Sequence, residues 1–449
     1  MMDFDVIFIG SGHANWHAAV TLKQAGKKVA IVEKDMVGGT CTNYGCDAKI
    51  ALDGPFQLVE QLNRFKGNGV KETPAINWPE LMAYKHQMID PLAPSMDGLF
   101  GQMGITMLKG SGVITDAHTV MVAGETYKTD YIVIGTGQRP ATLDIEGKEY
   151  VHDSREFLDI PDMPKRLTFI GSGVIAMEFA AMAATMGREV HIVEFADRAL
   201  GAFPKTYVDR LQAKLEQQGV VFHFNEAVTA VTKTEGGLTV TTKNGLNIET
   251  DYVLGATGRI ANVENIGLEN VGIDASRRGI KVNDHLQTSV ASIFASGDVI
   301  DKTQPKLTPT ATFESNYIAD VILGNDQPIS YPAIPSVVFT MPRISQVGVS
   351  VATATANPDE YRTQVVPFGK QLAFEFKLAL GAEATLVFDK TGYLVGASVY
   401  ADDADDLINL ITMIINGHFT QRQLNQQIFA FPSATSGVID LLRSLLPKD

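Results

Sequence analysis

Hydrophobic and polar residues follow one another along the chain in blocks that predict alternating strands and helices. An apolar strand, FDVIFIG (4–10), runs directly into GSGHANWHAAVTLKQAG (10–26), whose apolar spacing predicts a helix, and KKVAIVEK (27–34) predicts a second strand. The same order of strand, glycine turn, helix and strand returns in LTFIGSGVIAMEFAAMAATMGREVHIVEF (167–195). This alternation is typical of α/β proteins with parallel sheets, and its repetition predicts two such units.

Both glycine turns have the spacing of a dinucleotide-binding loop. The first glycine permits a tight turn, and the second lets the backbone approach a pyrophosphate at the helix N-terminus. Each following strand ends in a glutamate, placed where a carboxylate bonds ribose hydroxyls. Asn15 takes the position of the third glycine in the first turn. The residues concerned are Gly10, Gly12 and Glu33 in the first unit and Gly171, Gly173 and Glu194 in the second.

The second unit is expected to bind NADH in preference to NADPH. Glu194 can bond the 2′-hydroxyl of NADH and repels the 2′-phosphate of NADPH, which usually needs a nearby arginine. Phe195 and Gly201 occupy positions where such a basic residue is expected, although Arg198 lies between them. Two binding units therefore predict two dinucleotides, one of them NADH.

Composition and charge narrow the class of protein. The 449 residues are 45% hydrophobic and 20% charged, which indicates a globular chain of about three domains. A formal net charge of −14 argues against nucleic acid or an anionic membrane surface as the main partner. The N-terminus lacks a signal-peptide pattern, no apolar run is long enough to span a bilayer, and LINLITMII (407–415) predicts a core or interface helix. These features predict a cytoplasmic protein.

The chain has only two cysteines, Cys41 and Cys46, in the stretch GGTCTNYGC (38–46). A structural disulfide would close too short a loop to remove much chain entropy from the unfolded state. A zinc site needs three or four ligands, and no further Cys or His pair lies nearby to complete one, so we predict no metal site. A pair that cycles between dithiol and disulfide fits the spacing better, provided that a nearby group delivers electrons.

The order and spacing of the motifs resemble those of the class I FAD-dependent pyridine nucleotide-disulfide oxidoreductases, the family of glutathione reductase, dihydrolipoamide dehydrogenase and mercuric reductase. The resemblance covers nearly the whole chain. Besides the two glycine loops and the cysteine stretch, it rests on IVIGTGQRP (132–140), GATGRIANVENIGLE (255–269), IFASGDV (293–299), LTPTA (307–311) and VVFTMPRISQVGVS (337–350).

The resemblance implies the architecture. It predicts an α/β protein with two Rossmann-like dinucleotide-binding domains, for FAD and NAD, and a C-terminal α+β interface domain that forms a homodimer. The expected boundaries are 1–147 for the first part of the FAD domain, 148–256 for the NAD(P)H domain, 257–327 for the second part of the FAD domain and 328–449 for the interface domain.

The resemblance also implies roles for individual residues. Electrons would pass from NADH to FAD, then to the disulfide of Cys41 and Cys46, then to a substrate. Cys46 corresponds to the charge-transfer thiolate, Cys41 to the interchange thiol and Glu178 to the glutamate beside the nicotinamide. Lys49 lies one place before the family's flavin-side lysine, where Ile50 stands. The remaining cofactor-binding candidates are Gly135 and Asp298 for FAD and Gly258 for NAD.

The C-terminal stretch IFAFPSATSG departs from the disulfide-reducing members of the family. Phe431 stands where those members have a histidine, and Ser436 stands where they have a glutamate. The histidine protonates the thiolate that leaves when a disulfide is attacked, and such general acid catalysis contributes about 10²- to 10⁴-fold. His418 lies thirteen residues before Phe431, and we do not assign it the role of the missing histidine. In a homodimer, Phe431 is expected to face Cys41 of the partner subunit.

Loss of the acid favours a substrate whose leaving group needs no proton. Hypothiocyanous acid fits, because thiocyanate is the anion of a strong acid, and the sequence is similar to the bacterial hypothiocyanous acid reductases. We therefore predict a reductase of a small thiol-reactive oxidant. Three alternatives stay open: a reductase of a low-molecular-weight disulfide, a metal-ion reductase and a non-catalytic NADH sensor. The C-terminus LLRSLLPKD contains no thiol, which argues against the metal-ion reductase.

Overall fold

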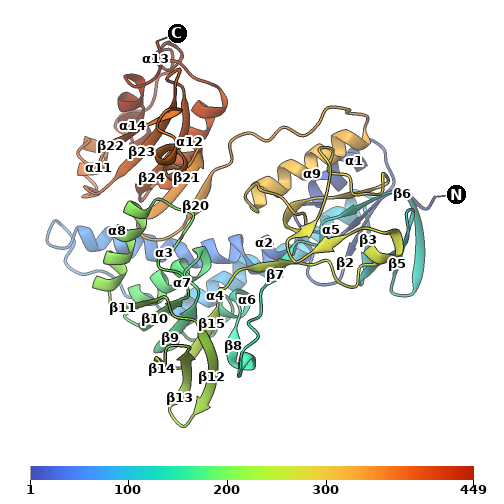
Figure 1. Ribbon diagram of the computed structural model, residues 1–449, viewed down its shortest axis with the longest axis horizontal. Coiled ribbons are helices and arrows are strands. Elements are labelled where there is room, and N and C mark those ends of the chain that lie inside the picture. The colour runs from blue at the N-terminus through green and yellow to red at the C-terminus, as the bar shows by residue number, and fades with distance from the viewer. Residues whose placement is uncertain (1, 449) are drawn as a thin grey trace.

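The computed structural model describes residues 2–448, which fold into two α/β units and a C-terminal α+β unit (Figure 1). The first unit is built on a seven-stranded sheet in the order β3-β2-β1-β6-β5-β4, with β19 also paired to β6. Its strands are β1 (Phe4–Ile9), β2 (Val29–Glu33), β3 (Thr106–Lys109), β4 (Gly112–Asp116), β5 (Thr119–Val122), β6 (Glu125–Ile134) and β19 (Ile293–Ala295). Strands β1, β2, β3, β6 and β19 run parallel, as the sequence pattern predicts.

Strand β19 joins two parts of the chain that are far apart in sequence. It pairs in parallel with β6, although the whole second unit lies between them along the chain. Helix α9 (Thr308–Ile322) follows β19 and packs against α1 (Trp16–Gln24), where Ser315 Oγ accepts a hydrogen bond from the Ala18 N–H at 3.0 Å. The first unit is therefore completed only by residues that come after the second unit.

The second unit has a five-stranded parallel sheet in the order β11-β10-β9-β15-β8. The strands are β8 (Val151–His152), β9 (Arg166–Ile170), β10 (Glu189–Glu194), β11 (Val220–Phe224) and β15 (Tyr252–Gly255), and the helices are α6 (Ser154–Phe157), α7 (Val174–Thr185) and α8 (Lys205–Gln217). An antiparallel sheet, β12 (Val228–Thr234), β13 (Gly237–Thr242) and β14 (Asn247–Thr250), projects from it.

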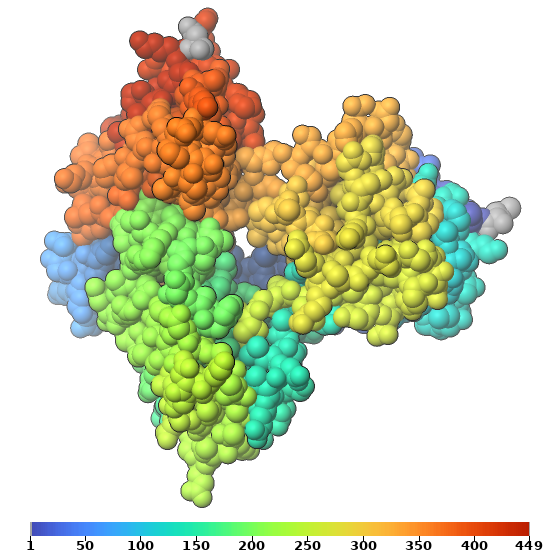
Figure 2. Space-filling model, in the orientation of Figure 1, coloured from blue at the N-terminus to red at the C-terminus, as the bar shows by residue number. Residues whose placement is uncertain are grey.

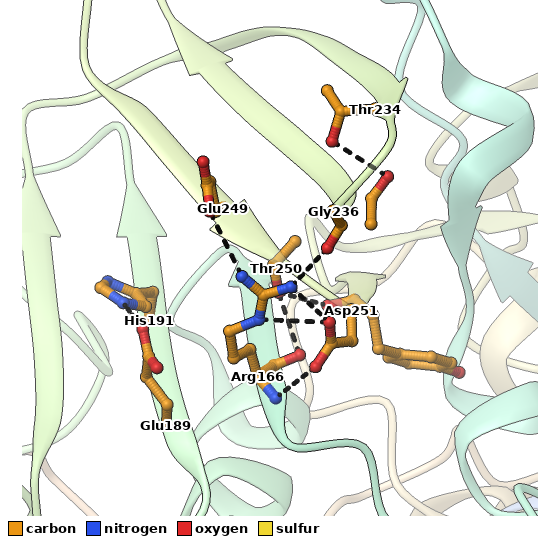
Figure 3. A network of polar contacts seen from close by, with 10 residues as sticks. Arg166, Glu189, His191, Thr234, Gly236, Glu249, Thr250 and Asp251 are labelled. Atoms are coloured by element: carbon orange, nitrogen blue, oxygen red, sulfur yellow. Dashed lines mark hydrogen bonds and ion pairs between the residues drawn. The ribbon is translucent and has the colours of Figure 1, made fainter.

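Arg166 holds the start of β9 to the end of that antiparallel sheet. Its guanidinium donates to Asp251 Oδ1 and to the Gly236 carbonyl, each at 2.6 Å, and reaches Glu249 at 3.4 Å (Figure 3). The Arg166 guanidinium therefore lies beside two carboxylates.

The third unit is an antiparallel sheet in the order β20-β21-β24-β23-β22, covered by helices. Its elements are β20 (Ser336–Val338), β21 (Arg343–Gly348), α10 (Val351–Ala356), β22 (Tyr361–Pro367), α11 (Leu372–Glu375), β23 (Glu383–Asp389), β24 (Leu394–Ala401), α12 (Ala404–Asn416), α13 (Gln421–Asn425) and α14 (Ala434–Arg443). Helix α12 contains the apolar run 407–415, and most of that run is buried against the sheet. A core or interface helix was expected there, and the structure shows a core helix.

A long helix ties the three units together. Helix α3 (Cys46–Arg64) begins at the second cysteine, directly after α2 (Gly39–Tyr44), and its buried face shares a core with α4 (Trp78–Ile89) and α7. At its other end, Arg64 pairs with Asp402 of the third unit. The space-filling view shows the surface hollowed between the second unit, in green, and the second segment of the first unit, in yellow (Figure 2). None of the helices described is long and apolar enough to cross a membrane.

The remaining elements include the crossing between the first two units. Strand β7 (Gln138–Pro140) pairs with β16 (Arg259–Ala261), so that the chain leaving the first unit and the chain returning to it run side by side. The others are α5 (Leu92–Gln102), β17 (Ala275–Ser276), β18 (Gly279–Ile280) and three 3₁₀ turns, η1 (Lys148–Tyr150), η2 (Leu268–Val271) and η3 (Gly297–Val299).

Candidate active site

The two cysteines lie where two helices begin. Cys41 is in α2 and Cys46 is the first residue of α3, and both side chains are thiols. Cys46 Sγ lies 3.6 Å from the Thr308 hydroxyl, and Thr308 is the first residue of α9. The positive ends of two helix dipoles therefore meet at the Cys46 sulfur, where they stabilise a thiolate.

The surroundings of the two thiols shift their pKa values in opposite directions. A hydrogen bond from Cys41, the Thr308 hydroxyl and the charge of Lys49 lower the pKa of Cys46 to about 6, against the effect of burial. The hydrogen bond to Cys46, together with burial, raises the pKa of Cys41. Near neutral pH, Cys46 is therefore the thiolate of the pair and Cys41 holds the proton.

Lys49 and Glu178 form a buried ion pair between the first two units. The Lys49 ammonium lies 3.4 Å from Glu178 Oε2, and the two side chains are only 11% and 6% exposed. The other Glu178 oxygen accepts a hydrogen bond from the Phe339 N–H at 2.7 Å, and the Lys49 ammonium lies 3.5 Å from the centre of the Phe339 ring. Burial raises the pKa of Glu178, while Lys49 opposes that rise. Ile50, by contrast, points to solvent.

A second buried charge cluster extends from this pair into the third unit. Arg343 donates to Asp53 at 3.2 Å and to Gln57 at 3.1 Å, and it pairs with Asp405. Burial raises the pKa of Asp53 despite the arginine. No sequence pattern indicated this cluster, because its members come from α3, β21 and α12 and meet only when the units pack.

The strand-end glutamates have the same contacts in both glycine loops. Glu33 Oε2 accepts hydrogen bonds from the Ser11 N–H at 2.9 Å and hydroxyl at 2.6 Å, and Glu194 Oε2 does the same with Ser172 at 2.8 and 2.7 Å. The Oε1 atoms each accept one backbone N–H, at 2.8 Å from Asp35 and 2.9 Å from Ala196. A carboxylate has about four lone-pair sites, so each glutamate keeps one for a ribose hydroxyl.

The glycine loops fit the phosphates of FAD and of a nicotinamide dinucleotide. Gly10 and Gly171 have φ near +100°, and a Cβ on either would lie 2.6 Å from a carbonyl of the neighbouring strand. At Gly12 and Gly173, no heavy atom comes closer than 4.0 Å to an added Cβ, so the backbone lies open to a ligand. Neither α1 nor α7 has a side-chain N-cap, which leaves their first N–H groups to an anion.

The other cofactor candidates lie around the same sheet edges. A Cβ on Gly135 would collide with Asn15, whose amide donates to the carbonyls of Ile9 at 3.0 Å and Gly10 at 2.8 Å. Asn15 thus fastens the start of α1 to the end of β1 where a third glycine was expected. Asp298 lies in η3, after β19, and Gly258, with φ +110°, lies after β15.

Phe431 comes just before α14 and Ser436 lies within it, and Figure 1 shows α14 in the third unit, well away from α2 of the same chain. Phe431 is 75% exposed. Ser436 is buried and completes the N-terminal cap of α14: its hydroxyl accepts the Ser433 N–H at 3.2 Å and donates to the Ser433 carbonyl at 3.0 Å. His418 has φ +46° and packs edge-on against Tyr393 beyond the end of α12.

One contact beside the cysteines was missed from the sequence. Tyr44, between the cysteines, donates to Asp35 at 3.2 Å, and the Arg155 guanidinium lies 3.5 Å from the centre of its ring. Arg155 also pairs with Asp35 at 3.0 Å. Burial raises the pKa of Tyr44 to about 12. The clamp formed by Tyr44, Asp35 and Arg155 therefore links the cysteine loop to α6 of the second unit.

Comparison with known proteins decides the family. Residues 4–315 match the family described as "Pyridine nucleotide-disulphide oxidoreductase", and residues 334–441 match its dimerisation domain. The chain belongs to the pyridine nucleotide-disulphide oxidoreductase family. The FAD and NAD Rossmann-like domains and the C-terminal dimerisation domain expected from the sequence are thereby shown. The family implies FAD and a pyridine nucleotide as cofactors, and the dimerisation domain suggests a homodimer.

Several members of the pyridine nucleotide-disulphide oxidoreductase family are similar over nearly the whole chain. The dihydrolipoyl dehydrogenase of Geobacillus stearothermophilus is 31% identical over 96% of this chain and 94% of its own, and the glutathione reductase of Pisum sativum is 29% identical over 98% and 82%. Among solved structures, the HOCl-induced flavoprotein disulfide reductase RclA from Escherichia coli superimposes with a TM-score of 0.88 at 26% identity, covering 98% of this chain and 99% of its own.

Proposed function

We propose that this family member transfers electrons from NADH through FAD and the Cys41–Cys46 pair to a small thiol-reactive oxidant, with hypothiocyanous acid as the substrate. Cys41, Cys46 and Glu178 are the catalytic residues of the proposal, and Phe431 borders the substrate path of the partner subunit. The proposed division at residues 147, 256 and 327 is supported by the sheet order, in which β19 returns to the first sheet.

The observation that carries the proposal is the absence of an acid where disulfide-reducing members hold one. Phe431 has no proton to give, and the Ser436 hydroxyl is committed to the cap of α14. No protein group at these two positions can protonate a departing thiolate. A substrate that releases a stable anion is therefore favoured over a disulfide.

The acidities of the two cysteines suit the proposed reaction. When bound, FAD supplies the two electrons that convert the disulfide to the dithiol. Cys41 sulfur then bonds to the sulfur of hypothiocyanous acid, and the hydroxyl leaves as water with the proton that Cys41 carried. The Cys46 thiolate attacks Cys41 sulfur, the bond to the thiocyanate sulfur breaks, and thiocyanate leaves without a proton. One NADH and one hypothiocyanous acid give NAD⁺, thiocyanate and water, with no further proton taken up.

The test is NADH oxidation by the FAD-loaded protein with hypothiocyanous acid, glutathione disulfide and lipoamide compared side by side. We expect fast turnover with the first and turnover with the disulfides lower by about 10²-fold or more, the contribution of a missing general acid. Cys41→Ser is expected to abolish turnover. The Cys46→Ser protein is expected to react with one molecule of oxidant per active site and then stop. Full turnover by the Cys41→Ser protein contradicts electron transfer through the cysteine pair. Faster turnover with a disulfide than with hypothiocyanous acid contradicts the proposed substrate.

Reduction of a low-molecular-weight disulfide is the second candidate, because the dihydrolipoyl dehydrogenase of Geobacillus stearothermophilus is 31% identical over nearly the full length. In that case a group other than Phe431 or Ser436 protonates the leaving thiolate. The same side-by-side assay distinguishes the two functions by the ranking of substrates.

A further inference from the structure

Asp47 is an acidic residue directly after the second cysteine. It lies in the first turn of α3 and is exposed. The hydrogen bond between the two thiols has the largest effect on the pKa values of Cys41 and Cys46, and the charge of Asp47 also acts on both, in the upward direction. A carboxylate whose field reaches both sulfur atoms also acts on any charged molecule that approaches them.

The cations near the cysteines are held by other groups. Lys49, two residues after Asp47, forms the buried pair with Glu178 at 3.4 Å. Arg259, on which the charge of Cys46 acts, donates to the Gln138 carbonyl at 2.6 Å. Within residues 2–448, no basic side chain lies at ion-pair distance from the Asp47 carboxylate. The negative charge beside the thiols is therefore not paired.

The histidines near Asp47 do not neutralise it either. Burial lowers the pKa of His13 by more than the charge of Asp47 raises it, so the imidazole is uncharged near neutral pH. Its Nδ1 lies 3.2 Å from His17 Nε2, and burial lowers the pKa of His17 to about 4. Thr312, one turn after Thr308 on α9, has its hydroxyl within 3.5 Å of both rings. The side of Asp47 that faces α1 and α9 therefore presents neutral polar groups.

We propose that Asp47 is a specificity-determining residue, whose carboxylate repels anionic molecules from the cysteine pair and leaves uncharged oxidants free to react. The inference rests on the proposed function and names the kind of substrate that the site accepts. Hypothiocyanous acid is uncharged and is not repelled, whereas glutathione disulfide carries a net negative charge and is. Thiocyanate leaves as an anion, so the same charge favours its departure.

An acid in the first turn of a helix also stabilises that helix through its dipole. The test therefore needs a readout that a structural role does not change. Iodoacetamide and iodoacetate alkylate a thiolate by the same reaction, and they differ in that the first is uncharged and the second is an anion. A change in the fraction of thiolate affects both rates equally and cancels in their ratio. The ratio of the two rates thus reports the electrostatic potential at the sulfur.

The rates are measured on the FAD-loaded protein, reduced with dithiothreitol that is then removed by gel filtration. At pH 8 the carboxyl of Asp47 is ionised, although partial burial raises its pKa. Asp47→Asn keeps the shape of the side chain and removes the charge. Two unit charges about 7 Å apart in water interact strongly enough to change a rate by about threefold. We expect Asp47→Asn to lower the ratio of the iodoacetamide rate to the iodoacetate rate by about that factor or more at low salt.

Two variants and a change of salt make the test specific. Asp47→Glu keeps the charge and is expected to keep the ratio. Glu235→Gln removes an exposed acid from the turn between β12 and β13, and this matched control is expected to leave the ratio unchanged. In 1 M salt, where the Debye length is about 3 Å, the effect of Asp47→Asn is expected to shrink.

A ratio that is the same in Asp47→Asn and in Glu235→Gln overturns the proposal. An effect of Asp47→Asn that persists undiminished in 1 M salt also overturns it, because such an effect is not electrostatic. The alkylation uses neither an oxidant nor NADH. Failure of this test is therefore distinguishable from failure of the proposed function, which is judged by the ranking of substrates in turnover.

Discussion

Replacing Lys49 by methionine tests whether the buried pair with Glu178 holds the first two units together. The substitution keeps the length and apolar stem of the side chain and removes only the charge. Glu178 is 6% exposed, and besides Lys49 its contact is one backbone N–H, from Phe339. Removing one partner of a buried pair costs about 3 to 5 kcal/mol, because the other charge is left in the interior. We expect a loss of that size at pH 8.

The loss is expected to depend on pH, with a sign fixed by Glu178. Burial already raises the pKa of Glu178, and in the Lys49→Met protein no ammonium group opposes that rise. A carboxyl whose pKa is higher in the folded than in the unfolded protein binds more protons when folded. Its contribution to stability is therefore present below the unfolded pKa and is lost as pH rises through the folded pKa. The Lys49→Met protein is expected to be less impaired at pH 5.5 than at pH 8.

The assay is urea unfolding of the protein at saturating FAD, followed by circular dichroism at both pH values. Lys281→Met is the control for loss of an exposed charge and is expected to change stability by less than about 0.5 kcal/mol. Lys49→Met with Glu178→Met is expected to recover most of the loss, since no charge then remains buried. A double variant as unstable as the single one, or a loss that is equal at both pH values, refutes the reasoning.

Three further predictions concern the chemistry. Alkylation of the reduced protein by iodoacetamide at Cys46 is expected to rise with a midpoint near pH 6, and Thr308→Val, which removes a hydrogen bond to the thiolate, is expected to move that midpoint upward. Glu194→Gln is expected to lower the ratio of kcat/KM with NADH to kcat/KM with NADPH. If this ratio is already below one in the unmodified protein, Glu194 does not select against the 2′-phosphate of NADPH. Phe431→His with Ser436→Glu is expected to raise turnover with disulfides by about 10²-fold, whereas Phe431→Leu, which adds no acid, is expected to leave it low.

The parts of the fold that depend on backbone geometry could be predicted from the sequence. The turns at Gly10 and Gly171 need positive φ and leave no room for a Cβ, so glycine is required there and its spacing can be recognised. The apolar run of α12 was predicted for a similar reason, because a helix with one apolar face has to bury it. Motifs of this kind, in their order and spacing, carried the resemblance that implied the family and the three-unit fold.

The contacts of long side chains could not be predicted in the same way. The sequence left open whether Lys49 reaches the flavin, which no contact in the structure tests, and it did not indicate the pair with Glu178, 129 positions away. The clamp of Tyr44, Asp35 and Arg155 and the cluster around Arg343 depend likewise on how the units dock. The way in which the units pack on one another depends on whole surfaces, and no short sequence motif indicates it.

The return of β19 to the first sheet has a consequence for synthesis of the chain. Ile134 ends β6, and its neighbour β19 begins at Ile293. A ribosome that adds about 5 to 20 residues per second needs about 8 to 30 s to make the intervening stretch of about 160 residues. During that time the end of β6 that contains Ile132 and Val133 pairs with β1 on one side and has no neighbour on the other. It is therefore an apolar edge of the kind to which other chains add. The second unit has every strand of its own sheet by residue 255, so that its folding can precede completion of the sheet that surrounds it in sequence.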